Sequence, residues 1–123
     1  MDRKARVREY RESRRPMGVY QVRNTVDGKL LVGVTTDLPS MLNRIKTQLF
    51  AGLHSCRALQ QDWDRLGPEA FAFEVVDTLA PPDDPGADPT DDLRLLEQLW
   101  LEELAPYGAR GYNVEPTVRT RRG

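Results

Sequence analysis

Few side chains in this sequence could carry out chemistry beyond simple charge pairing. His54 is the single histidine and Cys56 the single cysteine. Glu97 falls in a predicted helix between Leu93 and Trp100, a spacing that places its carboxylate beside a buried face, where an unpaired charge is unfavourable. A lone carboxylate binds Mg²⁺ weakly unless substrate phosphates supply further oxygens. Glu97 is therefore either a surface residue of the helix or the ligand of a weak Mg²⁺ or Mn²⁺ site.

The single cysteine and the short apolar runs exclude several classes of protein. One cysteine cannot form an intrachain disulfide, a Cys-x-x-Cys motif or a cysteine-based zinc site. The longest apolar run, residues 30–34, is far too short to span a bilayer, and the Arg-rich residues 1–15 contain no hydrophobic segment of a signal peptide. We expect a cytoplasmic protein of bacterial type that has no membrane partner.

The first element that would position a reactive side chain is a β-hairpin. Residues 18–23 favour a strand, Asp27 and Gly28 form a strong turn pair, and a second strand runs from about residue 29 to residue 35. Tyr20 lies on the first of these strands, where a tyrosine is commonly half-buried in the core. A third strand is predicted from Phe71 to Val76.

Three helices complete the predicted domain. The first has Thr36 or Asp37 as its cap and is ended by Gly52. The second and third end near residues 66 and 104. Their expected caps are Ser55 for the second helix and Thr90 or Asp91 for the third. Helical spacing groups the apolar residues as Leu38, Met41, Leu42, Ile45 and Leu49 in the first helix, Leu59, Trp63 and Leu66 in the second, and Leu93, Leu96, Leu99, Trp100 and Leu104 in the third.

This order, β-β-α-α-β-α, predicts a small α/β domain of the α+β class, with a three-stranded antiparallel sheet flanked by helices. We place the domain at residues 16–115, with a flexible acidic loop at 80–90. Residues 1–15 form a basic arm or helix, and residues 116–123 form a basic tail.

The net charge of −1 conceals a strong segregation of charge along the chain. Local basic patches, rather than the total charge, decide whether a protein binds phosphate. The N-terminal arm is therefore either a solvated segment or a nucleic-acid-binding arm. Its basic residues are Arg3, Lys4, Arg6, Arg8, Arg11, Arg14 and Arg15.

Several short motifs occur in the order typical of one nuclease family. Gly18-Val19-Tyr20 and Leu31-Val32-Gly33 lie on the two hairpin strands, and "GLHS" at 52–55, "LGPEAFAFEVV" at 66–76, "LLEQLW" at 95–100 and "GYN" at 111–113 follow. Together they resemble the GIY-YIG nuclease superfamily over residues 17–115. The two tripeptides stand where the family has Gly-Ile-Tyr and Tyr-Ile-Gly.

The resemblance implies metal-assisted hydrolysis of a phosphodiester bond. In that family a carboxylate on the last helix holds one divalent cation, and tyrosine, arginine and histidine side chains surround the phosphate. The matching residues here are Tyr20, His54 and Asn113 as catalytic positions and Glu97 as the metal ligand. Alternatively, each has an ordinary structural role: Tyr20 in the core, His54 in a loop, and Asn113 in a turn that secures the chain end.

Three other family positions have lost their polar groups. The second tyrosine is replaced by Leu31, the arginine by Met41, and the histidine of the first helix by Ile45. Removing one preorganised donor of this kind lowers a rate by about 10²- to 10³-fold. Arg44, three residues after Met41, is a possible replacement for the arginine, or else a solvent-facing residue.

Three functions remain open at this point. The first is a catalytically impaired GIY-YIG-type domain that binds nucleic acid, with DNA as the expected partner, and serves regulation, by analogy with similar domains attached to LuxR-like regulators. The second is an active divalent-metal-dependent DNA endonuclease. The third is a ligand-binding or protein-interaction module, or a homodimer, that uses the apolar surface of Leu31, Met41 and Ile45. Those residues could equally extend the core.

Overall fold

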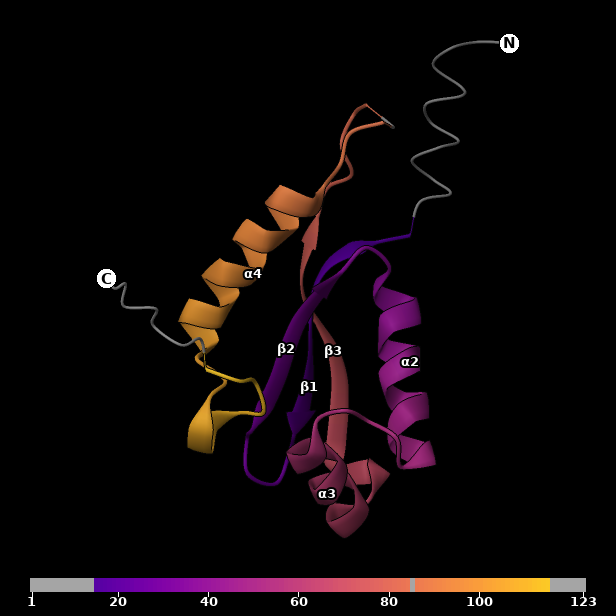
Figure 1. The fold of residues 1–123 in the computed structure, drawn as a ribbon, viewed down its shortest axis with the longest axis vertical. Helices are drawn as coiled ribbons and strands as arrows, with labels where there is room; N and C mark the ends of the chain where they lie inside the picture. The colour runs from indigo at the N-terminus through magenta and orange to yellow at the C-terminus, as the bar shows by residue number, and fades with distance from the viewer. Residues whose placement is uncertain (1–14, 85, 116–123) are drawn as a thin grey trace.

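A computed structural model of the chain describes residues 15–84 and 86–115 (Figure 1). Most of the predicted N-terminal arm, including Arg3, Lys4, Arg6, Arg8, Arg11 and Arg14, lies outside the described residues, as does the whole of the predicted tail. The elements are β1 (Met17–Asn24), β2 (Leu30–Thr35), α2 (Leu38–Ala51), α3 (Arg57–Leu66), the 3₁₀ turn η1 (Pro68–Ala70), β3 (Phe71–Leu79), α4 (Thr90–Leu104) and the 3₁₀ turn η2 (Gly108–Arg110).

The three strands form one antiparallel sheet in the order β2-β1-β3. The expected hairpin is confirmed, and its register places Val22 opposite Leu31 on β2 and opposite Phe73 on β3. Because paired residues project from the same face of a sheet, these three side chains share one face. β3 extends three residues beyond the predicted strand, to Leu79, and a register shift lies opposite the step from Val19 to Tyr20.

The first helix begins and ends where the sequence predicts. Asp37 is the cap of α2, and its carboxylate accepts a hydrogen bond from Ser40 N–H at 3.2 Å. Gly52, with φ 75°, ends the helix in the left-handed conformation that glycine adopts without strain.

The predicted caps of the other two helices are wrong. α3 begins at Arg57 with Cys56 in the cap position, so Ser55 lies one residue too early. In α4 the cap position is Pro89 and Thr90 is already helical, while the carboxylate of Asp88 accepts the Thr90 N–H at 3.0 Å. Asp88 therefore provides the local hydrogen bond that we expected from Thr90 or Asp91.

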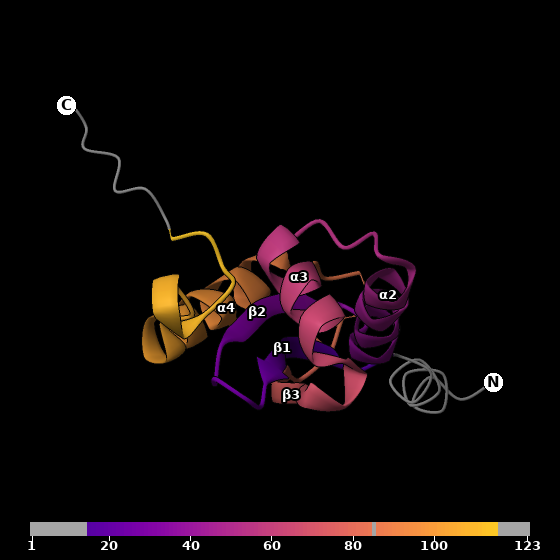
Figure 2. The ribbon, with the colours of Figure 1, turned by 90° about the horizontal axis from the view of Figure 1, so that it is seen from below.

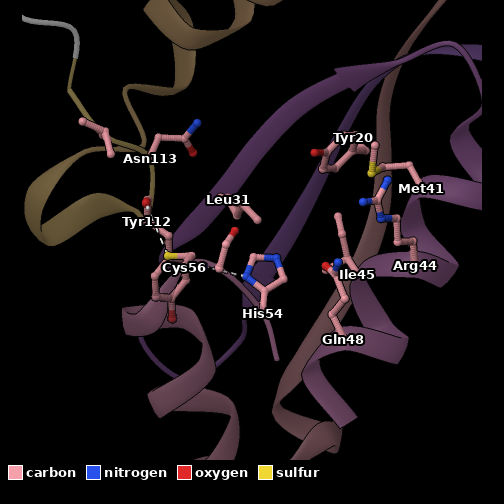
Figure 3. A pocket seen from close by; sticks show the side chains of 12 residues that line it. Tyr20, Leu31, Met41, Arg44, Ile45, Gln48, His54, Cys56, Tyr112 and Asn113 are labelled. Carbon is pink, nitrogen blue, oxygen red and sulfur yellow. Dashed lines mark hydrogen bonds between the residues drawn. The ribbon is translucent and has the colours of Figure 1, made fainter. Parts of the chain in front are cut away.

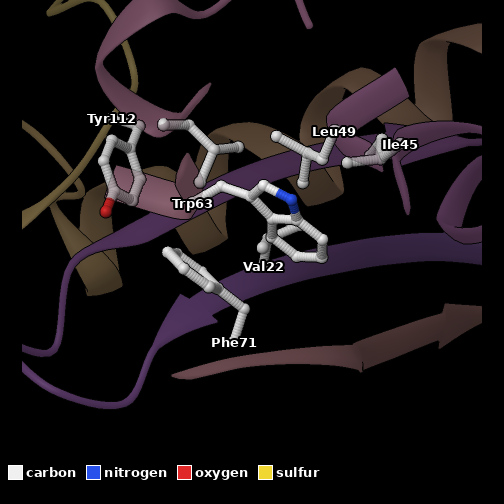
Figure 4. Packing of buried hydrophobic residues seen from close by; sticks show 7 residues of the cluster. Val22, Ile45, Leu49, Trp63, Phe71 and Tyr112 are labelled. Atoms are coloured by element: carbon white, nitrogen blue, oxygen red, sulfur yellow. The ribbon is translucent and has the colours of Figure 1, made fainter. Parts of the chain in front are cut away.

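The helices cover the two faces of the sheet, with α2 on one side and α4 on the other (Figures 1 and 2). The main core cluster lies between the sheet and the pair α2 and α3 (Figure 4). Trp63 is at its centre, with its ring 5.4 Å from the Phe71 ring and 5.1 Å from the Phe50 ring. The buried members of the cluster are Val22, Ile45, Leu49, Leu59, Trp63, Phe71 and Tyr112.

The face of α4 toward the sheet is narrower than the sequence predicts. Leu93 is buried, and Trp100 Nε1 donates a hydrogen bond to Asp77 Oδ2 of β3 at 2.9 Å. Leu99, which we grouped with the apolar face, is 54% exposed. Among the described helices none has both the length and the apolar character needed to cross a membrane.

Candidate functional site: a cleft beside the hairpin

A cleft of about 580 Å³ lies among the hairpin, α2, the α2–α3 loop and the C-terminal segment (Figure 3). It brings together side chains that are far apart in the sequence. Of the site candidates, including the three replaced family positions, those that line it are Tyr20, Leu31, Met41, Arg44, Ile45, His54 and Asn113. None of the described lining residues is Asp or Glu.

Tyr20 reaches the cleft by lying across the next strand. It pairs with Gly33 of β2, and a Cβ atom at position 33 would come within 2.5 Å of the Tyr20 hydroxyl. The glycine of the second tripeptide therefore makes room for the tyrosine of the first. Burial raises the pKa of Tyr20, and the nearby negative charge of Glu97 raises it further. The hydroxyl is thus protonated at neutral pH and can donate a hydrogen bond into the cleft.

Arg44 is the one cation among the described residues that line the cleft. It is exposed on α2, and Figure 3 shows its guanidinium beside Met41 and directed toward Tyr20. Within the described part of the chain, its side chain makes no hydrogen bond or ion pair. A guanidinium without a partner in an acid-free cleft can bind an oxyanion in bidentate fashion.

His54 is half-buried in the loop between α2 and α3. Its Nδ1 accepts a hydrogen bond from Cys56 N–H at 3.0 Å, drawn as a dashed line in Figure 3. Because Nδ1 is an acceptor here, the neutral ring carries its proton on Nε2. Burial lowers the pKa of His54, so the neutral form with an Nε2–H donor predominates at neutral pH.

Asn113 has a structural partner across the cleft. Its Oδ1 accepts Val32 N–H at 2.8 Å, and its Nδ2 donates to the Val32 carbonyl oxygen at 2.8 Å. The side-chain amide thus pairs with the free edge of β2 as a neighbouring strand would. This pair secures the C-terminal segment beside the sheet, the role that we considered as the alternative to catalysis.

The three aliphatic replacements do not have equal exposure. Ile45 is 3% exposed and is part of the core, whereas Leu31 and Met41 are half-buried and pack against it. Of the three replacements, only Leu31 and Met41 therefore present substantial apolar surface to the cleft, beside the exposed Val114.

Glu97 does not line the cleft. It is half-buried on α4 and faces a separate cavity of about 350 Å³, whose other lining residues include Arg94, Glu102 and Tyr107. The described residues contain no cluster of three His, Cys, Asp or Glu side chains suited to a metal ion. Glu97 therefore fits a divalent cation only as a single carboxylate, with the remaining oxygens supplied by phosphate and water.

Sequence reasoning missed the polar contacts that hold the C-terminal segment. The buried hydroxyl of Tyr112 donates to Asp62 Oδ2 at 2.7 Å and accepts from Asn24 Nδ2 at 3.0 Å. Asn24 is fully buried, and its Oδ1 accepts the Val26 N–H at 2.9 Å in the hairpin turn. An asparagine at the end of an otherwise buried strand pattern is the signal that could have indicated this network.

Comparison with known proteins bears on the fold. No family model matches the sequence, and no curated protein matches it. Among solved structures, the chain is similar to the catalytic domain of the homing endonuclease I-TevI, with 26% identity, 81% of this chain and 99% of that chain covered, and a TM-score of 0.67. A mutant of the same catalytic domain matches with 25% identity, 81% and 94% coverage, and a TM-score of 0.66. The chain therefore has the GIY-YIG fold.

Proposed function

We propose that this domain binds the phosphate backbone of nucleic acid in the cleft beside the hairpin and that it hydrolyses the backbone poorly. One observation carries the proposal. The cleft of a nuclease-type fold holds an unpaired guanidinium, Arg44, and no acidic side chain among its described lining residues. Such a site attracts an anion, because none of the described residues that line it carries a negative charge, and the nearby Glu97 faces another cavity.

Three donors face this cleft, and each suits a phosphate oxygen. Arg44 supplies a charge and a pair of parallel N–H groups. His54 supplies a neutral Nε2–H because its Nδ1 is occupied by Cys56 N–H. Tyr20 supplies a hydroxyl that stays protonated, since burial raises its pKa. Regulation through nucleic-acid binding is the role that we infer for a domain of this kind.

The same cleft is poorly suited to hydrolysis. Leu31 and Met41 present apolar atoms where a transition-state charge needs donors, and each lost donor lowers a rate by about 10²- to 10³-fold. A general base works best with a pKa near neutrality, and the pKa of Tyr20 is shifted upward, away from that range. Glu97, the candidate ligand for Mg²⁺ or Mn²⁺, faces another cavity. When bound, such an ion would stabilise the leaving oxygen.

The experiment is a fluorescence anisotropy titration of a labelled DNA duplex with the full chain at low salt. Arg44→Met should weaken binding and reduce the salt dependence. Arg110→Met is the matched control, because Arg110 is also exposed and lies outside the cleft lining. Equal affinities of native protein and Arg44→Met would contradict the proposal.

A second candidate function is an active metal-dependent endonuclease. The observation in its favour is electrostatic: Glu97 lies close enough to Tyr20 for its charge to raise the pKa of the hydroxyl. A carboxylate and a tyrosine near the same phosphate would suit hydrolysis. The test is nicking of supercoiled plasmid in Mg²⁺ or Mn²⁺, with Glu97→Ala beside the native protein. Cleavage that the variant abolishes would establish this function, and cleavage that persists in it would point to a contaminant.

The third possibility, an apolar interaction surface or homodimer contact, has less support. Ile45 is buried in the core, so the surface is reduced to Leu31 and Met41. Met41→Arg distinguishes the two interpretations. A variant that dissociates a complex without losing stability would support a docking surface, and one that only loses stability would assign Met41 to the core.

A further inference from the structure

We infer that Gln60, a residue of α3 that does not line the cleft, is a positioning residue that fixes the His54 loop so that Nε2–H of the imidazole faces the phosphate site. The inference rests on the proposed role of His54 as a phosphate donor. It concerns a side chain to which the sequence motifs give no function.

Gln60 is an unusual residue for its position. It is 8% exposed, and together with Asn24 it makes up the buried polar side chains of the described region. A buried amide is unfavourable unless its hydrogen bonds are satisfied. The hydrogen bonds of this side-chain amide go to the end of α2, to the His54 loop and to another residue of α3.

The contacts of Gln60 join these three segments. Its Oε1 accepts the backbone N–H of His54 at 3.0 Å. Its Nε2 donates to the Leu49 carbonyl oxygen at 3.0 Å and to Asp64 Oδ1 at 3.1 Å. Leu49 lies in the last turn of α2, and its carbonyl oxygen also accepts the N–H of the cap residue Gly52 at 3.1 Å. One side chain therefore ties the end of α2 to the residue that carries the imidazole.

The loop is fixed at a second point by its own backbone. Leu53 N–H donates to the Gln48 carbonyl at 2.8 Å as the chain leaves α2, and Cys56 N–H donates to His54 Nδ1 at 3.0 Å as it enters α3. The backbone of His54 is thus held by Gln60 and its ring by Cys56. Without the hydrogen bond from Gln60, the backbone of the loop can move. The hydrogen bond from Cys56 N–H then holds the ring only relative to that mobile backbone.

Among the described residues, three charged groups line the cavities that the His54 ring also lines. Arg44 shares the cleft with His54, and Arg57 and Asp64 share a second cavity of about 470 Å³ with it. Gln60 lines that second cavity as well, next to His54. Replacing Gln60 with a neutral residue leaves all three charges in place, so a change in the titration of His54 reports the ring's environment and hydrogen bonding.

The experiment uses the full chain and NMR of the imidazole, which is unambiguous because His54 is the single histidine. In the native protein we expect the Nε2–H tautomer and a pKa below 6.5. Gln60→Met removes every hydrogen bond of the amide at similar volume. We expect it to shift the pKa of His54 upward and to mix the tautomers. Gln61→Met is the matched control, because Gln61 is the exposed neighbour on the same helix.

Gln60→Glu supplies a second variant. It keeps an oxygen acceptor for His54 N–H and loses the donors to Leu49 and Asp64, with a carboxyl oxygen placed beside each of those acceptors. The variant therefore tests the contact with His54 alone: where it is folded, the Nε2–H tautomer should be retained. A third measurement needs no variant: in the native protein, hydrogen exchange of the His54 amide should be slower than that of Ser55. If Gln60→Met is folded and its tautomer and pKa match the native values, or if the His54 amide exchanges as fast as that of Ser55, the positioning role is wrong.

DNA affinity separates this inference from the function on which it rests. Gln60→Met should weaken binding by no more than the factor measured for His54→Ala, and the double variant should bind no more weakly than His54→Ala alone. If His54→Ala binds DNA as tightly as the native protein, the proposed phosphate role of His54 fails. In that case a shifted tautomer in Gln60→Met would still establish that Gln60 positions the ring.

Discussion

The Tyr20 side chain lies across Gly33 of the neighbouring strand, with room for no larger residue at position 33. A Cβ atom there would lie 2.5 Å from the hydroxyl oxygen and 2.7 Å from Cζ of the ring. The two tripeptides of the hairpin are therefore coupled by packing as well as by backbone pairing. This contact directs the tyrosine into the cleft.

Gly33→Ala should displace the Tyr20 ring and destabilise the domain by about 1–3 kcal/mol, the usual penalty for overpacking. Urea unfolding of the purified variant measures this effect. The same substitution in a Tyr20→Ala background should have little effect, because the ring is gone. If Gly33→Ala destabilises the domain equally in both backgrounds, the loss of stability does not come from contact with the Tyr20 ring.

Tyr112→Phe should lower the free energy of unfolding by about 1–3 kcal/mol, because it leaves the buried amide of Asn24 without its acceptor. Tyr107→Phe is the control, since the Tyr107 hydroxyl has no hydrogen-bond partner within the described residues and its removal should change stability little. Chemical denaturation of both variants gives the comparison. A Tyr112→Phe protein as stable as the native one would mean that the network contributes nothing measurable.

The sequence predicted local features well because they depend on neighbouring residues. Asp37 lies just before a proline-containing first turn, and a cap of this kind is visible without the fold. Cys56 could not be predicted as the cap position of α3, because the loop before it is held by a hydrogen bond from His54 N–H to the Gln60 side chain. The preference for Ser55 came from residue type alone.

For the candidate site, the sequence predicted which residues lie at the cleft but not all of their partners and positions. The family register indicated Tyr20, His54 and Asn113, and all three line one cleft. The partner of the Asn113 amide, Val32, lies 81 residues away in the chain, and no local pattern reveals such a pair. Glu97 was expected with the others and faces a separate cavity, because helical spacing fixes the buried side of α4 but not its distance from the hairpin.

The stability of the domain should fall as the pH is lowered through the range in which His54 titrates. The pKa of His54 is lowered by burial relative to its unfolded value of 6.5, so the unfolded state binds more protons there. This contribution is fully present above pH 6.5 and is lost as the pH falls through the lower folded pKa. Urea unfolding at several pH values should show this slope in the native protein. If a His54→Gln variant shows the same dependence of unfolding free energy on pH, another titrating group causes that dependence.

Deletion of residues 1–15 should weaken DNA binding and reduce its salt dependence. Of the predicted arm, the structure describes Arg15, which is exposed and lies 3.9 Å from Asp37 through its Nε. Each phosphate contact that is lost should reduce the slope of log K against log salt by about 0.9. Anisotropy titrations at several salt concentrations measure both quantities. If the variant that lacks residues 1–15 binds DNA with unchanged affinity and unchanged salt dependence, the arm does not contact the DNA.

The central claim, that the cleft binds nucleic-acid phosphate, is tested most directly by titrating a DNA duplex into the full chain and following the imidazole signals of His54. One histidine in the chain makes the signal unique, and its ring lines the cleft. The account predicts saturable shifts of these signals, with the same midpoint as the anisotropy titration and with DNA strands that remain intact in Mg²⁺. Binding that saturates while the His54 signals stay unchanged would place the nucleic acid elsewhere and contradict the account.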